Sequence, residues 1–217
     1  MTQVLDLDAI EAAKVTQEPY PHFIVDQAFV GDAVQQVLKD FPHLDKGGSF
    51  PLDGLEYGPR IEALVKELDS PEFRRIIEDK LQIDLTNRPM TVTARGYSRA
   101  KDGRIHTDSK SKLITVLIYL NESWEAPTGR LRVLRDGENM QDYVAEIAPT
   151  VGKMFAFKVT PDCWHGYESF EGQRQSIQMN YVVDEKAFNK HQSRHGFTAK
   201  LKSLFAGKRG KQETESA

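Results

Sequence analysis

The chain has 217 residues, of which 39% are hydrophobic and 28% are charged, and its formal net charge is -3. This balance excludes a disordered chain and an overall basic nucleic-acid binder, and the length suits a single domain. The single cysteine, Cys163, excludes an intrachain disulfide and a cysteine-based zinc cluster. No apolar run approaches the roughly 20 residues of a membrane span, and the first residues lack the pattern of a signal peptide, so we expect a cytoplasmic protein.

The first 88 residues are predicted to be mainly helical. Apolar spacing and proline positions predict helices over 7–15, 30–41, 59–68 and 71–81, and a short strand over 23–25. Ser70 is the expected N-cap of the last helix, with Pro71 at its first position. The glycine- and proline-containing segment 43–58 is predicted to be a loop that could act as a lid.

From Pro89 to Val183 the pattern changes to short runs rich in β-branched and aromatic residues, separated by turn residues. The predicted strands cover 90–97, 113–121, 130–134, 143–147, 153–158, 164–168 and 173–183. Both faces of the strand 113–121 are mostly apolar, so we expect it to be buried between the interior of the β-structure and the helices. The predicted fold class is α+β: a double-stranded β-helix (jelly roll) with the N-terminal helices packed on one sheet.

The predicted domain organisation is one domain over 1–185, with a helical support over 1–88 and a jelly-roll core over 89–185. Residues 186–217 form a separate basic tail, with eight Lys and Arg against two acidic residues, for which we expect a C-terminal helix. Residues 1–185 are correspondingly acidic. A basic contact surface for an anionic partner is therefore an alternative role for the tail.

Two histidines and one aspartate are the candidate metal ligands. His106 and Asp108 are two residues apart, and in an extended chain they would project to the same side. His165 follows 59 residues later. Two imidazoles and one carboxylate on one face of an octahedral ion form the facial triad typical of non-haem Fe(II) oxygenases. The sequence does not identify the acceptors that would orient the imidazoles.

Arg174 is the candidate anion-binding residue. It follows His165 by nine residues, and we expect its strand to pair with the strand that carries His165. A guanidinium there could bind a carboxylate through two hydrogen bonds, and Ser176 would face the same way. With Ile177, Met179 and Tyr181 packed on the helices, Arg174 and Ser176 would face the cavity, together with Gln178 and Asn180.

The order His106-x-Asp108, His165, Arg174 resembles the 2-oxoglutarate/Fe(II)-dependent dioxygenases, and the prolyl 4-hydroxylase-like branch in particular. The run Tyr119-Leu120-Asn121, Trp124 and Gly129-x-Leu131 are similar to further motifs of that branch. The resemblance covers roughly residues 95–183. Thr128-Gly129 departs from the two glycines that many members have, which affects a strand edge and no ligand.

The resemblance implies a 2-oxoglutarate-dependent dioxygenase of the EC 1.14.11 type that uses Fe(II), 2-oxoglutarate and O2, with ascorbate as a further candidate. His106, Asp108 and His165 would bind the iron. Arg174 would bind the far carboxylate of 2-oxoglutarate, helped by Tyr119 and Ser176, and Tyr97 would touch the co-substrate. The substrate would be an amino acid, a peptide or another small molecule, hydroxylated with release of succinate and CO2.

Other readings stay open at this point. A jelly-roll module could bind metal and 2-oxoglutarate as a sensor without turnover. A cupin-type metalloenzyme would need more histidines near the first strand, and a Cys163–His165 nucleophilic pair would need attack geometry that an extended strand rarely provides. Neither a membrane nor a nucleic acid is an expected partner, and a homodimer is an open alternative.

Overall fold

The computed structural model describes residues 3–191 and residue 193. Its helices are α1 (Leu7–Ala12), α2 (Ala33–Asp40), α3 (Pro59–Leu68) and α4 (Pro71–Leu81), with a short 3-10 helix η1 (Leu52–Gly54). Its strands are β1 (His22–Val25), β2 (Phe50–Pro51), β3 (Met90–Ser98), β4 (Lys112–Tyr119), β5 (Leu131–Leu134), β6 (Tyr143–Ile147), β7 (Met154–Lys158), β8 (His165–Gly166) and β9 (Gly172–Val182).

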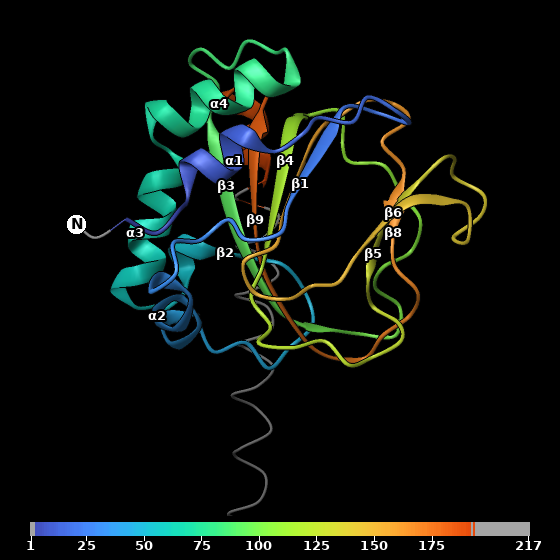
Figure 1. Ribbon diagram of the computed structural model, residues 1–217, viewed down its shortest axis with the longest axis horizontal. Helices are drawn as coiled ribbons and strands as arrows, with labels where there is room; N and C mark the ends of the chain where they lie inside the picture. The colour runs from blue at the N-terminus through green and yellow to red at the C-terminus, as the bar shows by residue number, and fades with distance from the viewer. Residues whose placement is uncertain (1–2, 192, 194–217) are drawn as a thin grey trace, which may run out of the picture.

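The strands form two antiparallel sheets that face each other (Figure 1). The larger sheet has the order β1-β7-β4-β9-β3-β2, and the smaller one has the order β6-β5-β8. In Figure 1 the helices lie on the outer side of the larger sheet, and the smaller sheet lies on the other side. This mixture of helices and antiparallel sheets agrees with the predicted jelly-roll class.

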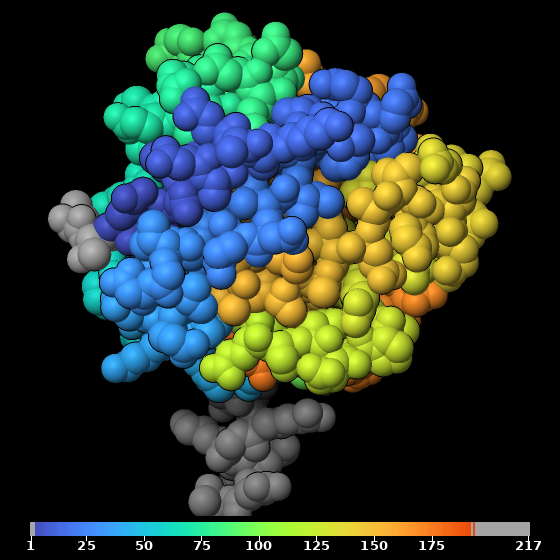
Figure 2. All heavy atoms as spheres, viewed as in Figure 1, coloured from blue at the N-terminus to red at the C-terminus, as the bar shows by residue number. Residues whose placement is uncertain are grey.

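The N-terminal helices begin where the sequence places their capping residues. The Ser70 hydroxyl accepts a hydrogen bond from the backbone N–H of Phe73 at 3.2 Å, and Pro71 occupies the first turn of α4. The Asp6 carboxylate caps α1 in the same way, accepting from Ala9 at 2.9 Å. In the space-filling view the first part of the chain, coloured blue, covers much of the visible face (Figure 2).

Strand β4 separates two apolar clusters. Ile114, Val116 and Ile118 are fully buried in a cluster that includes apolar side chains of all four helices, such as Leu64. Tyr119, on the opposite face of β4, belongs to a second cluster between the two sheets. The prediction that this strand is buried on both faces is therefore confirmed.

Three expectations differ from the structure. The segment 43–58 contains β2 and η1, because Phe50 and Pro51 pair with Ala94 and Thr93 at the edge of the larger sheet. The strand expected over 164–168 is reduced to His165–Gly166, whose partner among the strands of the described residues is β5. The strand of Arg174 does not pair with the strand of His165, because β9 lies between β3 and β4 in the larger sheet.

Most of the basic tail lies outside the described residues, so the C-terminal helix expected over 186–217 stays a prediction. Within the described part, residues 185–191 are helical. In the portion of the chain that the structure covers, none of the helices combines the length and the apolar character that crossing a bilayer requires.

Candidate metal and 2-oxoglutarate site

His106 and His165 lie side by side because their backbones pair. The N–H of each residue donates to the carbonyl of the other at 3.0 Å, which makes an isolated antiparallel bridge between segments 59 residues apart. The two ring centroids are 4.3 Å apart. The approach is close: a Cβ on Gly166 would lie 2.8 Å from the carbonyl oxygen of Gly103. Glycine at position 166 therefore allows the two segments to meet.

Both imidazoles are held by backbone acceptors. Nδ1 of His106 donates to the carbonyl of Arg104 and Nδ1 of His165 donates to the carbonyl of Cys163, each at 2.8 Å. Because a carbonyl oxygen only accepts, these bonds fix the proton on Nδ1 and leave Nε2 with a free lone pair. Burial, and then the neighbouring His106, lower the pKa of His165 to about 4, so its ring is neutral at neutral pH. These are the orienting acceptors that the sequence did not identify.

Asp108 is anchored from two sides. Its Oδ1 lies 3.1 Å from the Lys112 ammonium, and its Oδ2 accepts a short hydrogen bond from the Thr115 hydroxyl. Thr115 in turn accepts from the side-chain amide of Asn180 at 2.7 Å. Burial raises the pKa of the Asp108 carboxyl, but Lys112, His165 and Thr115 outweigh it, and the net pKa lies below the usual value. The group is therefore a carboxylate at neutral pH.

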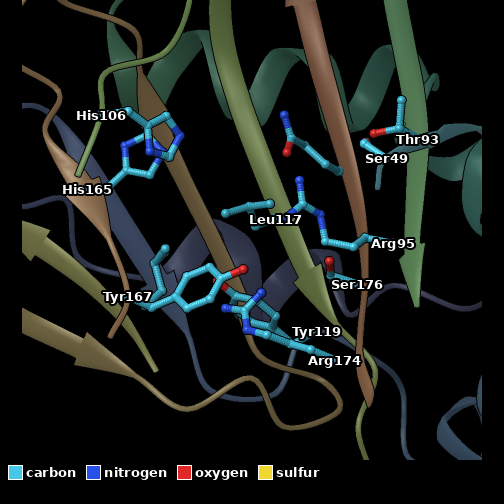
Figure 3. Close-up of a pocket in the computed structure, with 12 residues that line it drawn as sticks. Ser49, Thr93, Arg95, His106, Leu117, Tyr119, His165, Tyr167, Arg174 and Ser176 are labelled. Atoms are coloured by element: carbon cyan, nitrogen blue, oxygen red, sulfur yellow. The ribbon is translucent and has the colours of Figure 1, made fainter. Parts of the chain in front are cut away.

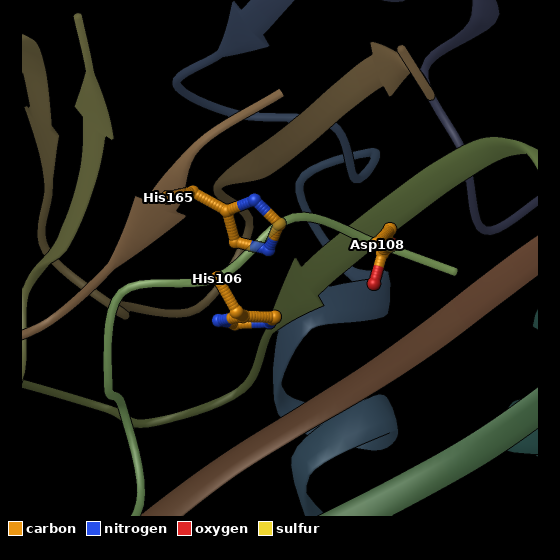
Figure 4. Close-up of side chains that lie close together, drawn as sticks. All are labelled: His106, Asp108 and His165. Carbon is orange, nitrogen blue, oxygen red and sulfur yellow. The ribbon is translucent and has the colours of Figure 1, made fainter. Parts of the chain in front are cut away.

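The three side chains converge (Figure 4). One ligand atom from each of His106, Asp108 and His165 lies within 4.8 Å of the others. Among the described residues this is the one group of three or more histidine, cysteine or acidic side chains with such geometry. Two imidazoles and a carboxylate are a donor set that suits Fe(II).

An inner cavity of about 70 Å³ extends from the two histidines to Arg174 between the sheets (Figure 3). Arg174 is 4% exposed; its Nε donates to the Gly129 carbonyl at 2.9 Å, and its guanidinium carbon lies 4.1 Å from the centre of the Tyr167 ring. Two buried polar atoms of this wall, Nη2 of Arg174 and the hydroxyl of Tyr119, have no hydrogen-bond partner among the described residues. Buried donors without partners are costly, so this end of the cavity suits an oxyanion.

The other walls of the inner cavity combine apolar and polar groups. Leu117, Leu131 and the Tyr167 ring supply apolar surface between the histidines and Arg174. Ser176 lines the same end and pairs across the sheet with Tyr119. Burial raises the pKa of Tyr119, so its hydroxyl keeps its proton and can donate a hydrogen bond.

An outer cavity of about 400 Å³ opens on the other side of His106. Asp108 and Lys112 lie in its wall, and the inner and outer cavities share the side chains of Ser49, Thr93, Arg95, His106 and Gln178. The metal-ligand candidates therefore stand where a small cavity and a larger one meet.

The structure brings six of the seven predicted site residues to these cavities, and Tyr97 is the exception. Tyr97 lies outside the residues that line them, beyond a shift of register between Arg95 and Tyr97 in the pairing of β3 with β9. The sequence reasoning missed Arg95 and Tyr167. Arg95 alternates with apolar Val92 and Ala94, and Tyr167 is two residues from His165, so the period of two would have found both.

Solved structures with a similar fold include prolyl hydroxylases. A prolyl-4-hydroxylase from Pseudomonas putida is 14% identical with a TM-score of 0.53, and the match covers 82% of this chain and 93% of that chain. A prolyl 4-hydroxylase from Phytophthora capsici is also 14% identical, with a TM-score of 0.49 over 76% of this chain and 59% of that one. At this identity the first match supports the fold alone. No curated protein sequence matches the chain.

The family comparison concerns the part of the chain that carries the site. Residues 92–182, from β3 to the end of β9, match the model of the 2OG-Fe(II) oxygenase superfamily. This stretch contains the two histidines, the aspartate and the arginine described above. Residues 92–182 thus match the core of the 2OG-Fe(II) oxygenases, which are oxidoreductases that need Fe(II), 2-oxoglutarate and O2, and the resemblance seen in the sequence is confirmed.

Proposed function

We propose that this protein hydroxylates a small substrate, using Fe(II) held by His106, Asp108 and His165. The observation that carries the proposal is that both histidines of a 2-His-1-carboxylate group line the same cavity as the buried Arg174. A histidine pair with a purely structural role would not need a buried arginine in the same cavity. The bound metal and co-substrate would supply the oxidising chemistry, converting a C–H bond to C–OH with release of succinate and CO2.

The chain's own residues divide the remaining work. Arg174 binds the far carboxylate of 2-oxoglutarate, and the Tyr119 hydroxyl donates to the same group, with Ser176 beside it. The apolar wall at Leu117 and Leu131 excludes water around the methylene carbons of the co-substrate. Thr115 and Lys112 hold the Asp108 carboxylate in place, and the backbone carbonyls that bind both Nδ1 atoms keep both Nε2 atoms directed at the metal.

The helices have a supporting role in this proposal. We infer that residues 1–185 act as one domain in which the helical segment 1–88 stiffens the larger sheet and the core 89–185 performs the chemistry. One apolar cluster joins helix residues such as Leu64 and Ile77 to sheet residues such as Val116 and Met179, which supports this division. A cytoplasmic location, a homodimer and a use of ascorbate stay predictions.

The test is an anaerobic titration of the purified protein with Fe(II) and then 2-oxoglutarate. The wild type should develop the weak visible charge-transfer band of the metal–co-substrate chelate. Arg174→Met should bind 2-oxoglutarate about 10- to 100-fold more weakly, since a hydrogen-bonded buried charge contributes about 1.5–3 kcal/mol. Wild-type protein that forms no band, or an Arg174 variant with unchanged affinity, would contradict the proposal.

Turnover is then measured as succinate release across amino acids, peptides and other metabolites, with His106→Ala as the inactive control. Substrate-dependent succinate release supports a hydroxylase. A protein that binds both Fe(II) and 2-oxoglutarate but releases no succinate under any condition would instead be a binding or sensing module.

A further inference from the structure

Arg95 occupies the wall that the inner and outer cavities share. It lies on β3 directly opposite Ser176 of β9, and it is partly buried. In Figure 3 its side chain extends into the space between Arg174 and the two histidines. None of the hydrogen bonds and ion pairs found among the described residues involves this guanidinium. A cation that is partly removed from water and makes no hydrogen bond or ion pair with the protein is available for a ligand anion.

Among the described residues, the walls of the two cavities contain no carboxylate that is ion-paired with Arg95. Arg95, Arg174 and Lys112 are the lysine and arginine side chains in the two walls, and Asp108 is the one carboxylate there. Lys112 is paired with Asp108 at 3.1 Å, and Arg174 is assigned to the far carboxylate of 2-oxoglutarate. The two positive charges of Fe(II) and the two negative charges of 2-oxoglutarate cancel. With Asp108 balancing Lys112 and 2-oxoglutarate balancing Fe(II), the loaded site retains the two positive charges of Arg174 and Arg95, which favours a negatively charged third component.

The outer cavity has the size and polarity of a site for a small polar molecule. Its volume of about 400 Å³ lies within the usual range for small-ligand pockets. Thr91, Thr93, Gln178 and Asn180 supply neutral hydrogen-bonding groups around Arg95. The apolar side chains Leu117, Leu131 and Tyr167 line the inner cavity and not the outer one. The surface next to the metal ligands is thus built for polar contacts.

We propose that Arg95 binds a carboxylate of the hydroxylated substrate, so that the substrate is a small free carboxylic acid and not an internal residue of a peptide. The inference rests on the proposed function, because it assumes that Arg174 and the metal ligands bind 2-oxoglutarate. Thr93, on the same face of β3, and Gln178 of β9 contact the remaining polar groups of this acid. The guanidinium thereby orients one C–H bond of the acid toward the metal.

The experiment compares free acids with their carboxamides. Wild-type protein loaded anaerobically with Fe(II) and 2-oxoglutarate is titrated with a panel of free L-amino acids, hydroxy acids and dicarboxylic acids, and with the matching amides. The visible band should shift with at least one free acid and not with its amide. The same acid should stimulate succinate release when oxygen is admitted.

Three variants test the role of Arg95. Arg95→Met should raise KM for that acid about 10- to 100-fold, the effect of losing one charge-assisted hydrogen bond, while the affinity for 2-oxoglutarate changes less than about 2-fold. Arg95→Lys keeps the charge and should recover part of the affinity. Arg135→Met removes an exposed arginine that is paired with Asp142 away from the cavities, and it should behave as the wild type.

The outcomes separate the inference from the proposed function. Turnover that prefers amides or internal peptide residues would overturn the role of Arg95, as would a loss of 2-oxoglutarate affinity in Arg95→Met as large as that in Arg174→Met. In both cases the wild-type protein would still bind Fe(II) and 2-oxoglutarate. A protein that binds neither Fe(II) nor 2-oxoglutarate would instead contradict the proposed function itself.

Discussion

The two faces of the larger sheet are made by the same strands, but one face packs against the helices and the other lines the cavity. On β9, Ile177, Met179 and Tyr181 are buried in the cluster that includes the helices. Ser176 and Gln178, which alternate with them, line the cavity. One face of the sheet therefore supplies stability and the other supplies polar groups, and a strand's period of two keeps them separate. Substitutions on the two faces should consequently affect different measurements.

The largest effect should come from His106, a candidate metal ligand on the cavity side. We expect His106→Ala to reduce succinate release more than about 100-fold, because loss of groups that only orient ligands already costs about 10- to 100-fold. His106 is exposed, so its unfolding free energy should change by less than about 1 kcal/mol. His43→Ala, at an exposed histidine outside the cavities, is the matched control. A His106→Ala protein that still releases succinate would contradict the functional role assigned to the cavity side.

A substitution on the helix side should show the opposite pattern. Ile118 is fully buried, and Ile118→Ala should lower the free energy of unfolding by about 2–5 kcal/mol through lost burial and a cavity. The affinity for 2-oxoglutarate, measured where the protein is still folded, should stay close to that of the wild type. Ile118→Val should cost only about 0.5–1.5 kcal/mol. A large loss of co-substrate affinity in folded Ile118→Ala would mean that the two faces are coupled.

Thr115 tests the support of the carboxylate ligand. Thr115→Val keeps the side-chain shape but removes the hydroxyl that bonds to Asp108, so Fe(II) affinity should fall about 10- to 100-fold. Thr115→Ser keeps the hydroxyl and should retain most of the affinity. Equilibrium Fe(II) titration under anaerobic conditions measures both. Equal affinities of the two variants would show that Lys112 alone is enough to hold Asp108.

The smallest effect should be the contribution of His22, on the edge strand β1, to the pH dependence of the free energy of unfolding. His22 on β1 is buried, and burial lowers its pKa from 6.5 despite its hydrogen bond to the Tyr20 carbonyl. The folded state then resists protonation, while the unfolded state takes up a proton below about pH 6.5, so stability falls as the pH decreases through that value. His22→Gln should reduce this loss by at most about 1.4 kcal/mol per pH unit. Denaturant unfolding at pH 7.5 and 5.5 measures the difference, and parallel pH slopes in both proteins would contradict it.

Much of the fold followed from local patterns. Helix α4 begins at Pro71 and ends at Leu81 as predicted, because Ser70, Pro71 and the apolar spacing act within one segment. The alternation on β9 likewise predicted which side chains face the cavity. The pairing of strands was less accessible: β8 is only two residues long and pairs with β5, which no local pattern indicates.

The sequence by itself predicted the candidate site, since two histidines, one aspartate and one arginine in this order indicated iron and, through the family resemblance, 2-oxoglutarate. Only the tertiary structure decided how they meet. His106 and His165 come together through a backbone bridge between segments 59 residues apart, and Arg174 faces them from the opposite sheet. The unpaired Arg95 could be recognised only there, because the absence of a partner depends on everything that folds around a side chain. Local patterns fix which face a residue takes, whereas long-range packing fixes what that face meets.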